Sequence, residues 1–75
     1  MSLLIQAYLL DKYGPRLNVE QLCDCLGLKP GTVYNQISAK TFGIPTYVDG
    51  GRRWADYRDV AEAFDRMRAG ANSAG

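Results

Sequence analysis

The residues best suited to chemistry lie in two short stretches of the chain. In the first, Thr32 and Asn35 are spaced to share one side of a helix. Asn can pair both polar atoms of its amide with an adenine edge, and Thr can contact a thymine methyl. In the second, Arg52 and Arg53 follow Asp49-Gly50-Gly51, and arginine binds phosphate or enters a narrow minor groove. These residue types predict contact with a nucleic acid, with plain solvent exposure as the alternative.

Four neighbours extend this set. Lys29 and Lys40 bracket the first stretch and are natural phosphate contacts, although lysines are also the commonest solvated residues. Tyr34 lies on the flank of the same helix, where its body can pack while its hydroxyl points outward. The residues predicted to contact DNA are therefore Lys29, Thr32, Tyr34, Asn35, Gln36, Lys40, Arg52 and Arg53.

The distribution of charge supports this interpretation better than the net charge of +1 does. Residues 29–58 have a local balance of +3, and the segments on either side are each −1. A basic middle between mildly acidic ends would face the phosphates of a duplex on one side only.

Catalysis and metal binding are not expected. There is no His, there are only two Cys, and the acidic residues are scattered at helix caps and on outer faces. Cys23 and Cys25 are not expected to form a disulfide, because side chains two apart on a helix diverge. Cys23 falls on the apolar side of its helix and is predicted to pack, whereas Cys25 is predicted to be a partly exposed thiol. We therefore expect no enzyme activity, no cofactor and no metal, and a reducing cytosol suits both thiols.

These residues need elements to position them, and the chain from 18 to 40 reads as a helix-turn-helix. Asn18 can cap a helix, with Gln21 at its third position as a weak capping box. Gly27 supplies a left-handed stop. Pro30 suits the first turn of a second helix that ends at Lys40. Such a second helix is built to enter the DNA major groove.

The segment that follows reads as a basic wing and a last helix. The wing covers residues 46–54, where Asp-Gly is a strong hairpin signal, and Trp54 is predicted to be its main core aromatic. Asp56 can cap a helix over 57–68. The stretch 70–75 is small and polar and is predicted to be disordered.

An extra helix is predicted to precede this unit, from residue 3 to 13, capped by Ser2. Its apolar residues cover more than one side, which predicts self-association as a dimer or as cooperative neighbours on DNA. The alternative is that the second side covers the back of the helix-turn-helix. The residues predicted to mediate self-association are Leu3, Leu4, Leu9 and Leu10.

These elements give one domain over residues 1–69 followed by the tail. The fold class is mainly α with a small β-hairpin: a winged helix-turn-helix with an additional N-terminal helix. No apolar run is long enough to span a bilayer, and the N-terminal Leu-Leu-Ile group lacks a basic leader. We expect no membrane partner.

The sequence resembles a known family over residues 17–68. Four stretches look like the excisionase and AlpA-like winged-helix group, related to the DNA-binding head of the MerR family: Leu17–Leu28, Thr32–Ile37, Gly50–Trp54 and Tyr57–Phe64. Tyr8–Gly14 is more faintly similar to prophage pyocin-activator proteins. The resemblance implies a recognition helix at Pro30–Lys40 and a wing at Tyr47–Trp54. The sequence departs from the family pattern at Asn35, where an Arg is common.

The resemblance implies double-stranded DNA as partner and a bacterial cytoplasmic, nucleoid-associated location. The family includes factors that bend prophage attachment DNA so that an integrase excises it, and small activators and repressors; the sequence leaves these open. The rival hypothesis is a protein-interaction module that binds an integrase, polymerase or repressor through its N-terminal helix. The low net charge favours this rival slightly.

Overall fold

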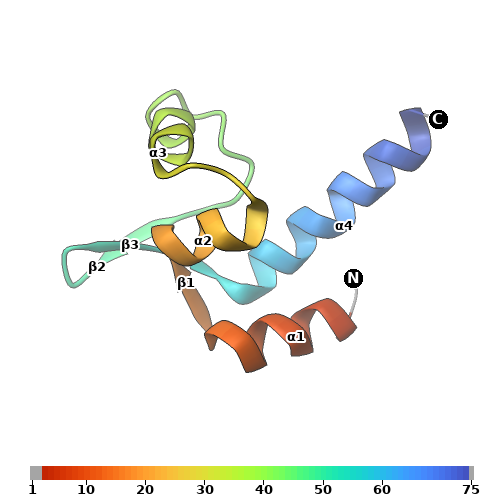
Figure 1. The fold of residues 1–75 in the computed structure, drawn as a ribbon, viewed down its shortest axis with the longest axis horizontal. Helices are drawn as coiled ribbons and strands as arrows, with labels where there is room; N and C mark the ends of the chain where they lie inside the picture. The colour runs from red at the N-terminus through yellow and green to blue at the C-terminus, as the bar shows by residue number, and fades with distance from the viewer. Residues whose placement is uncertain (1–2, 75) are drawn as a thin grey trace.

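The computed structural model describes the backbone of residues 3–74 and the side chains of residues 3–70. The predicted Ser2 cap lies outside the described residues. The described chain is mainly helical with a small three-stranded antiparallel sheet (Figure 1). Its elements are α1 (Leu3–Tyr13), β1 (Arg16–Asn18), α2 (Val19–Leu26), α3 (Pro30–Ser38), β2 (Tyr47–Asp49), β3 (Arg52–Asp56) and α4 (Tyr57–Ala74).

The sheet has the strand order β1-β3-β2. β2 and β3 form the predicted hairpin, whose two turn residues Gly50 and Gly51 have φ of 62° and 79°. Both values are positive, as a tight turn that matches the strand twist requires, and only glycine adopts them without strain. The other edge of β3 pairs with β1, where Leu17 lies opposite Ala55. The sequence did not predict β1, so the hairpin is one part of a larger sheet.

The first helix of the predicted helix-turn-helix is held by the capping box that the sequence indicated. Asn18 Oδ1 accepts a hydrogen bond from the Gln21 N–H at 2.8 Å, and Gln21 Oε1 accepts one from the Asn18 N–H at 3.0 Å. Gly27 ends the helix with φ of 70°, and its N–H bonds to the Cys23 carbonyl. Both ends of α2 are therefore fixed by local bonds, which sets the direction in which the chain enters α3.

Two helix ends differ from the prediction. α3 ends at Ser38, two residues early, because the chain reverses through Lys40 with φ of 59°. α4 starts at the predicted cap, where Asp56 Oδ1 accepts a hydrogen bond from the Arg58 N–H at 2.8 Å. It continues to Ala74, through most of the stretch predicted to be disordered. Alanine is the best helix former, and a single Gly70 costs only about 1 kcal/mol.

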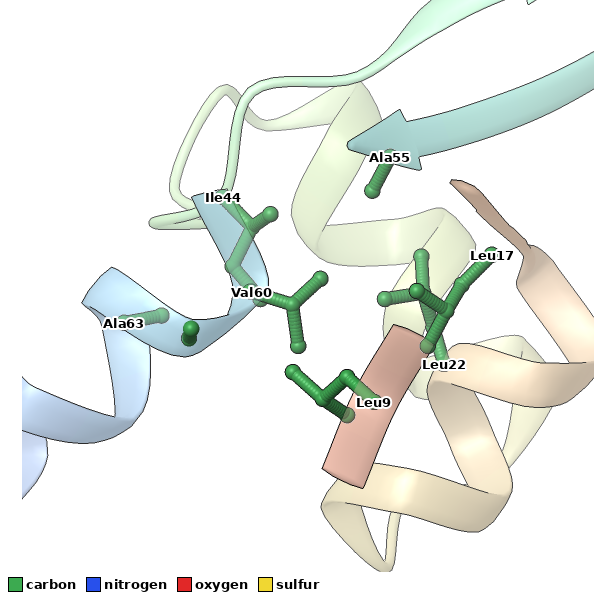
Figure 2. Close-up of a cluster of buried hydrophobic side chains, with 8 residues drawn as sticks. Leu9, Leu17, Leu22, Ile44, Ala55, Val60 and Ala63 are labelled. Carbon is green, nitrogen blue, oxygen red and sulfur yellow. The ribbon is translucent and has the colours of Figure 1, made fainter. Parts of the chain in front are cut away.

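One buried cluster joins α1, β1, α2, β3 and α4 (Figure 2). In Figure 2, Leu9 of α1 points toward Val60 of α4, with Leu17 and Leu22 beside it. A second cluster, made of Val19, Cys23 and Val33, fastens α3 onto α2. The half-buried Phe42 packs against both clusters. The apolar side of α3 is thus held in place while its other side stays free.

The two ends of the molecule contain different elements. In Figure 1 the β2–β3 hairpin and α3 lie on the left, α1 lies at the bottom, and the distal part of α4 extends to the upper right. None of the helices described here has both the length and the apolar character needed to cross a membrane.

Candidate functional site

The outward side of α3 carries the residues predicted to read bases. Val33 is fully buried and Ile37 half-buried, and they anchor the helix. Thr32 and Asn35 are exposed, and the 100° turn per residue places Asn35 at the centre of the side opposite these anchors. Lys29 occupies the N-cap position and makes no side-chain cap bond, since an ammonium group has no acceptor.

A groove separates α3 from the wing. Its volume is ≈ 430 Å³. Tyr34 faces it from α3 with 52% of its surface exposed, so both its ring and its hydroxyl are accessible. Glu20 contributes the one carboxylate of the groove. The lining residues are Asn18, Val19, Glu20, Tyr34, Val48, Gly51, Arg52 and Arg53.

Gln36 lies apart from the other predicted contacts. One residue beyond Asn35, it is turned by 100° to the flank away from the wing. There it is half-buried and lines a second groove with Phe42 and Met67. Its backbone carbonyl accepts hydrogen bonds from the N–H groups of Thr41 at 2.9 Å and Phe42 at 3.2 Å, which closes the end of α3. We therefore remove Gln36 from the candidate site.

The two wing arginines alternate along β3, as extended backbone requires. Arg53 shares a face with Ala55, and its Nη1 donates a hydrogen bond to Thr46 Oγ1 at 2.8 Å. Arg52 is exposed and sits opposite Asp49 at the hairpin end. Arg53 is therefore held by the loop that precedes β2, whereas Arg52 is free to reach outward.

Arg16 of β1 is a contributor that the sequence did not indicate. Its guanidinium carbon lies 3.9 Å from the centroid of the Trp54 ring, and its Nη1 donates to Asp49 Oδ2 at 2.7 Å. Trp54 Nε1 donates to the Asp49 carbonyl at 3.1 Å. The hydrogen bond to the Asp49 carboxylate is the main reason why the pKa of Arg16 is raised. This cluster ties the three strands together and neutralises the one acidic side chain of β2.

The same cluster corrects the prediction for Trp54. We expected this residue to be the core aromatic of the wing, but it is half-buried and lies on the outer face of the sheet. The cause is strand parity: Ala55 points into the core, so its neighbour must point away. Trp54 instead supplies the surface on which Arg16 stacks.

The ion pairs divide the basic residues into two groups. Four of the nine Lys and Arg side chains pair with an acid: Lys12 with Asp24, Arg16 with Asp49, Arg58 with Asp56, and Arg66 with Glu62. The others have no acidic partner within the described part of the chain. They are Lys29, Lys40, Arg52 and Arg53, all on or next to α3 and the wing, and Arg68 on α4.

Lys40 extends the positive surface beyond the end of α3. Its side chain is exposed and lines a small crevice of ≈ 290 Å³ together with Thr46 and Arg53. Lys29 stands exposed at the opposite end of the helix. The two lysines therefore lie at the two ends of α3, and their contact with phosphate stays a prediction.

The two cysteines are free thiols, with Cys23 buried and Cys25 half-buried. Burial is the main cause that raises the pKa of each, so both are protonated at neutral pH. The residues that the structure describes contain no group of three or more His, Cys, Asp or Glu side chains able to hold a metal ion.

The residues predicted to mediate self-association do not share one face. Leu3, Leu4 and Leu10 are 77%, 84% and 44% exposed, whereas Leu9 is 1% exposed and belongs to the core. We therefore remove Leu9 from that set. The alternative, in which the second side of the helix covers the back of the helix-turn-helix, does not fit three exposed leucines.

No protein family model, curated protein or solved structure matches this chain. The resemblance to the excisionase and AlpA-like group therefore remains a prediction from the quoted motifs.

Proposed function

We propose that this protein binds double-stranded DNA as a winged helix-turn-helix domain. In this proposal α2 and α3 form the helix-turn-helix, and the β2–β3 hairpin forms the wing. The proposal is supported by the order of the elements, since a hairpin follows the second helix directly and lies beside its free face. It is also supported by the firm attachment of α3 through Val33, which leaves the opposite side for the major groove.

The observation that carries the proposal is the position of the unpaired cations. An exposed Lys or Arg beside a carboxylate gains little by also approaching phosphate, because the acid repels the same ligand. Lys29, Lys40, Arg52 and Arg53 form no ion pair among the described residues, and they lie on or next to α3 and the β2–β3 hairpin. The local excess of positive charge that phosphate binding requires is therefore present where α3 can reach the bases.

Each residue has a distinct role in the proposed complex. Asn35 and Thr32 face the base edges in the major groove. The Tyr34 hydroxyl, Arg52 and Arg53 contact the sugar-phosphate backbone along the groove between α3 and the wing. Lys29 and Lys40 contact phosphates at the two ends of α3. Arg16 acts indirectly by holding the wing and neutralising Asp49.

We place the biological role among proteins of mobile elements and prophages, on the strength of the motif resemblance. The protein then acts on attachment-site DNA as an excisionase-like directionality factor, on a promoter as a transcription regulator, or on both. It needs no cofactor for either task and works in the bacterial cytoplasm at the nucleoid. Footprinting on DNA that contains both an attachment site and the nearest promoters separates the two roles.

The proposal is tested by measuring binding to random-sequence duplex DNA at several salt concentrations. The wild type should lose affinity steeply as salt rises, and Arg52→Ala or Arg53→Ala should lower the salt slope by about one unit per lost phosphate contact. Arg68→Ala is the matched control, because Arg68 is also exposed and unpaired among the described residues but lies on α4. Salt-independent binding, or equal effects of all three variants, would contradict the proposal.

The second candidate function is a protein-interaction module that binds an integrase, a polymerase or a repressor through α1. The exposure of Leu3, Leu4 and Leu10 favours it. It predicts no salt-dependent binding to duplex DNA, so the same titration separates the two functions.

A further inference from the structure

The outer face of α1 carries an apolar stripe over its first eight residues. Leu3, Ala7 and Leu10 follow one another at intervals of four and three residues, the spacing of a helix-pairing seam. All three are exposed, and Leu4 flanks them. The opposite side of the helix packs on the core through Leu9. Monomeric proteins rarely leave such a continuous patch in water without a function.

The charges around this stripe indicate what covers it. Of the two charged residues of α1, both exposed, Asp11 lies on the side of the stripe. Lys12 is turned to the far flank, where its Nζ lies 5.6 Å from the ring centroid of Tyr8 and 5.3 Å from that of Tyr13. Asp11 therefore sits without a cation near the C-terminal end of α1, where the helix dipole disfavours a negative charge. A partner that brings positive potential to this position is favoured.

We infer that two copies of this chain pair through α1, with the two helices antiparallel about a two-fold axis at Ala7. In this register Leu4 of each copy lies opposite Leu10 of the other. Asp11 lies opposite the first turn of the other helix, whose positive dipole end attracts it. The small Ala7 meets its own copy at the centre, where a larger side chain would hold the helix axes apart.

A parallel pair of α1 helices is disfavoured by the charge of Asp11. It would place the two Asp11 carboxylates side by side at one end of an apolar interface, where like charges repel. The antiparallel pair removes this repulsion and is closed, because each copy presents the same surface to the other. The stripe has far fewer residues than the roughly 20–30 per side of a stable interface, so the dimer is weak and depends on concentration.

Sedimentation velocity without DNA tests the pairing over a range of protein concentrations. The wild type should shift toward dimer at high concentration, and Leu4→Glu or Leu10→Glu should remain monomeric. Met67→Glu is the matched control, because Met67 is a similarly exposed apolar residue on α4, and it should associate like the wild type. A wild type that stays monomeric throughout, or a control that is as disruptive as the α1 variants, would overturn the inference.

Asp11→Asn tests the direction of the helices. The antiparallel pair loses two favourable charge-dipole interactions, so its dissociation constant should rise roughly threefold or more. A parallel pair would lose a repulsion instead, and its dissociation constant should fall. Tighter association of this variant would therefore overturn the antiparallel arrangement.

Disulfide trapping tests the register. In a Cys25→Ser background, with Cys23 buried, an equimolar mixture of Leu4→Cys and Leu10→Cys should crosslink under mild oxidation. Asp11→Cys alone should not, because its two thiols lie at opposite ends of the pair. The reverse result would overturn the register. These experiments contain no DNA, so their failure leaves the DNA-binding proposal untouched.

Discussion

Two regions of the molecule that lie apart in Figure 1, α3 with the β2–β3 hairpin and α1, expose different kinds of side chain. At the end formed by α3 and the wing, Lys29, Lys40, Arg52 and Arg53 form no ion pair among the described residues, and the exposed side chains of α3 include the polar Thr32 and Asn35. On α1, three leucines are exposed, and the cation Lys12 lies near Asp24 and two tyrosine rings. In a nearly neutral chain, the proposed binding of a polyanion therefore depends on which cations lack an acidic partner more than on the number of charges.

The first prediction asks whether α1 is part of the fold as well as a surface. Leu9→Ala should lower the free energy of unfolding by about 2–5 kcal/mol, since it leaves a cavity in the cluster shared with Leu17 and Leu22. Leu4→Ala, on the exposed side, should change it by less than about 0.5 kcal/mol. Urea denaturation of both variants gives the comparison. Similar losses would mean that the exposed side also packs within one chain.

The second prediction tests whether Asn35 on α3 contacts bases. Asn35→Ala should weaken binding to a duplex selected from a random pool by about 1–3 kcal/mol and have little effect on unselected DNA. Gln36→Ala is the matched control, because Gln36 is next to Asn35 but lies on the flank away from the wing. This variant should leave both affinities nearly unchanged. Fluorescence anisotropy with the two duplexes measures the affinities of the wild type and of both variants. Equal losses on both duplexes would make Asn35 a phosphate contact, and a larger effect of Gln36→Ala would restore it to the site.

The sequence predicted the elements that depend on local signals. The capping box at Asn18, the stop at Gly27, the hairpin and the cap at Asp56 are each encoded within a few residues. The exposure of Thr32 and Asn35 followed from the same logic, because Val33 fixes which side of α3 is buried.

What the sequence could not supply depends on pairing between distant segments. β1 is only three residues long, too short to show alternation, and it is a strand because β3 lies beside it. The same pairing decides that Ala55 faces inward and Trp54 outward. The stacking of Arg16 on Trp54 follows from that register. The wing is therefore the region where prediction from sequence was weakest, even though its turn was the clearest local signal.

The third prediction concerns Asp56, at the junction where the sheet passes into α4. Its carboxylate caps the helix and pairs with the Arg58 guanidinium. The hydrogen bonds from this guanidinium are the main reason why the pKa of Asp56 is lowered. Asp56→Ala should cost about 1 kcal/mol at pH 7. Glu62→Ala, which breaks an exposed 3.6 Å ion pair, should cost less.

The sign of the pH dependence follows from the direction of that shift. A carboxylate whose pKa is lower in the folded state contributes fully above its unfolded pKa, near 3.9. The contribution is lost as pH falls through the lower folded value. The stability difference between wild type and Asp56→Ala should therefore be constant above about pH 5 and shrink in more acidic solution. A difference that grows on acidification would contradict the role assigned to the carboxylate.

The last prediction separates stability from binding at the α3 end. Lys40 has φ of 59°, a conformation that costs a residue with a side chain about 1–2 kcal/mol. Lys40→Gly relieves this strain but adds freedom to the unfolded chain, so the net gain in stability should be about 0.5–1 kcal/mol. The same change removes a cation from the proposed DNA face, so the salt slope of DNA binding should fall by about one unit. Lys40→Gln is the control that removes the charge and keeps the strain: it should lose the same affinity without the gain in stability. If Lys40→Gly were more stable and bound DNA as tightly as the wild type, the lysine would be no phosphate contact, and the positive surface would end with α3 and the wing.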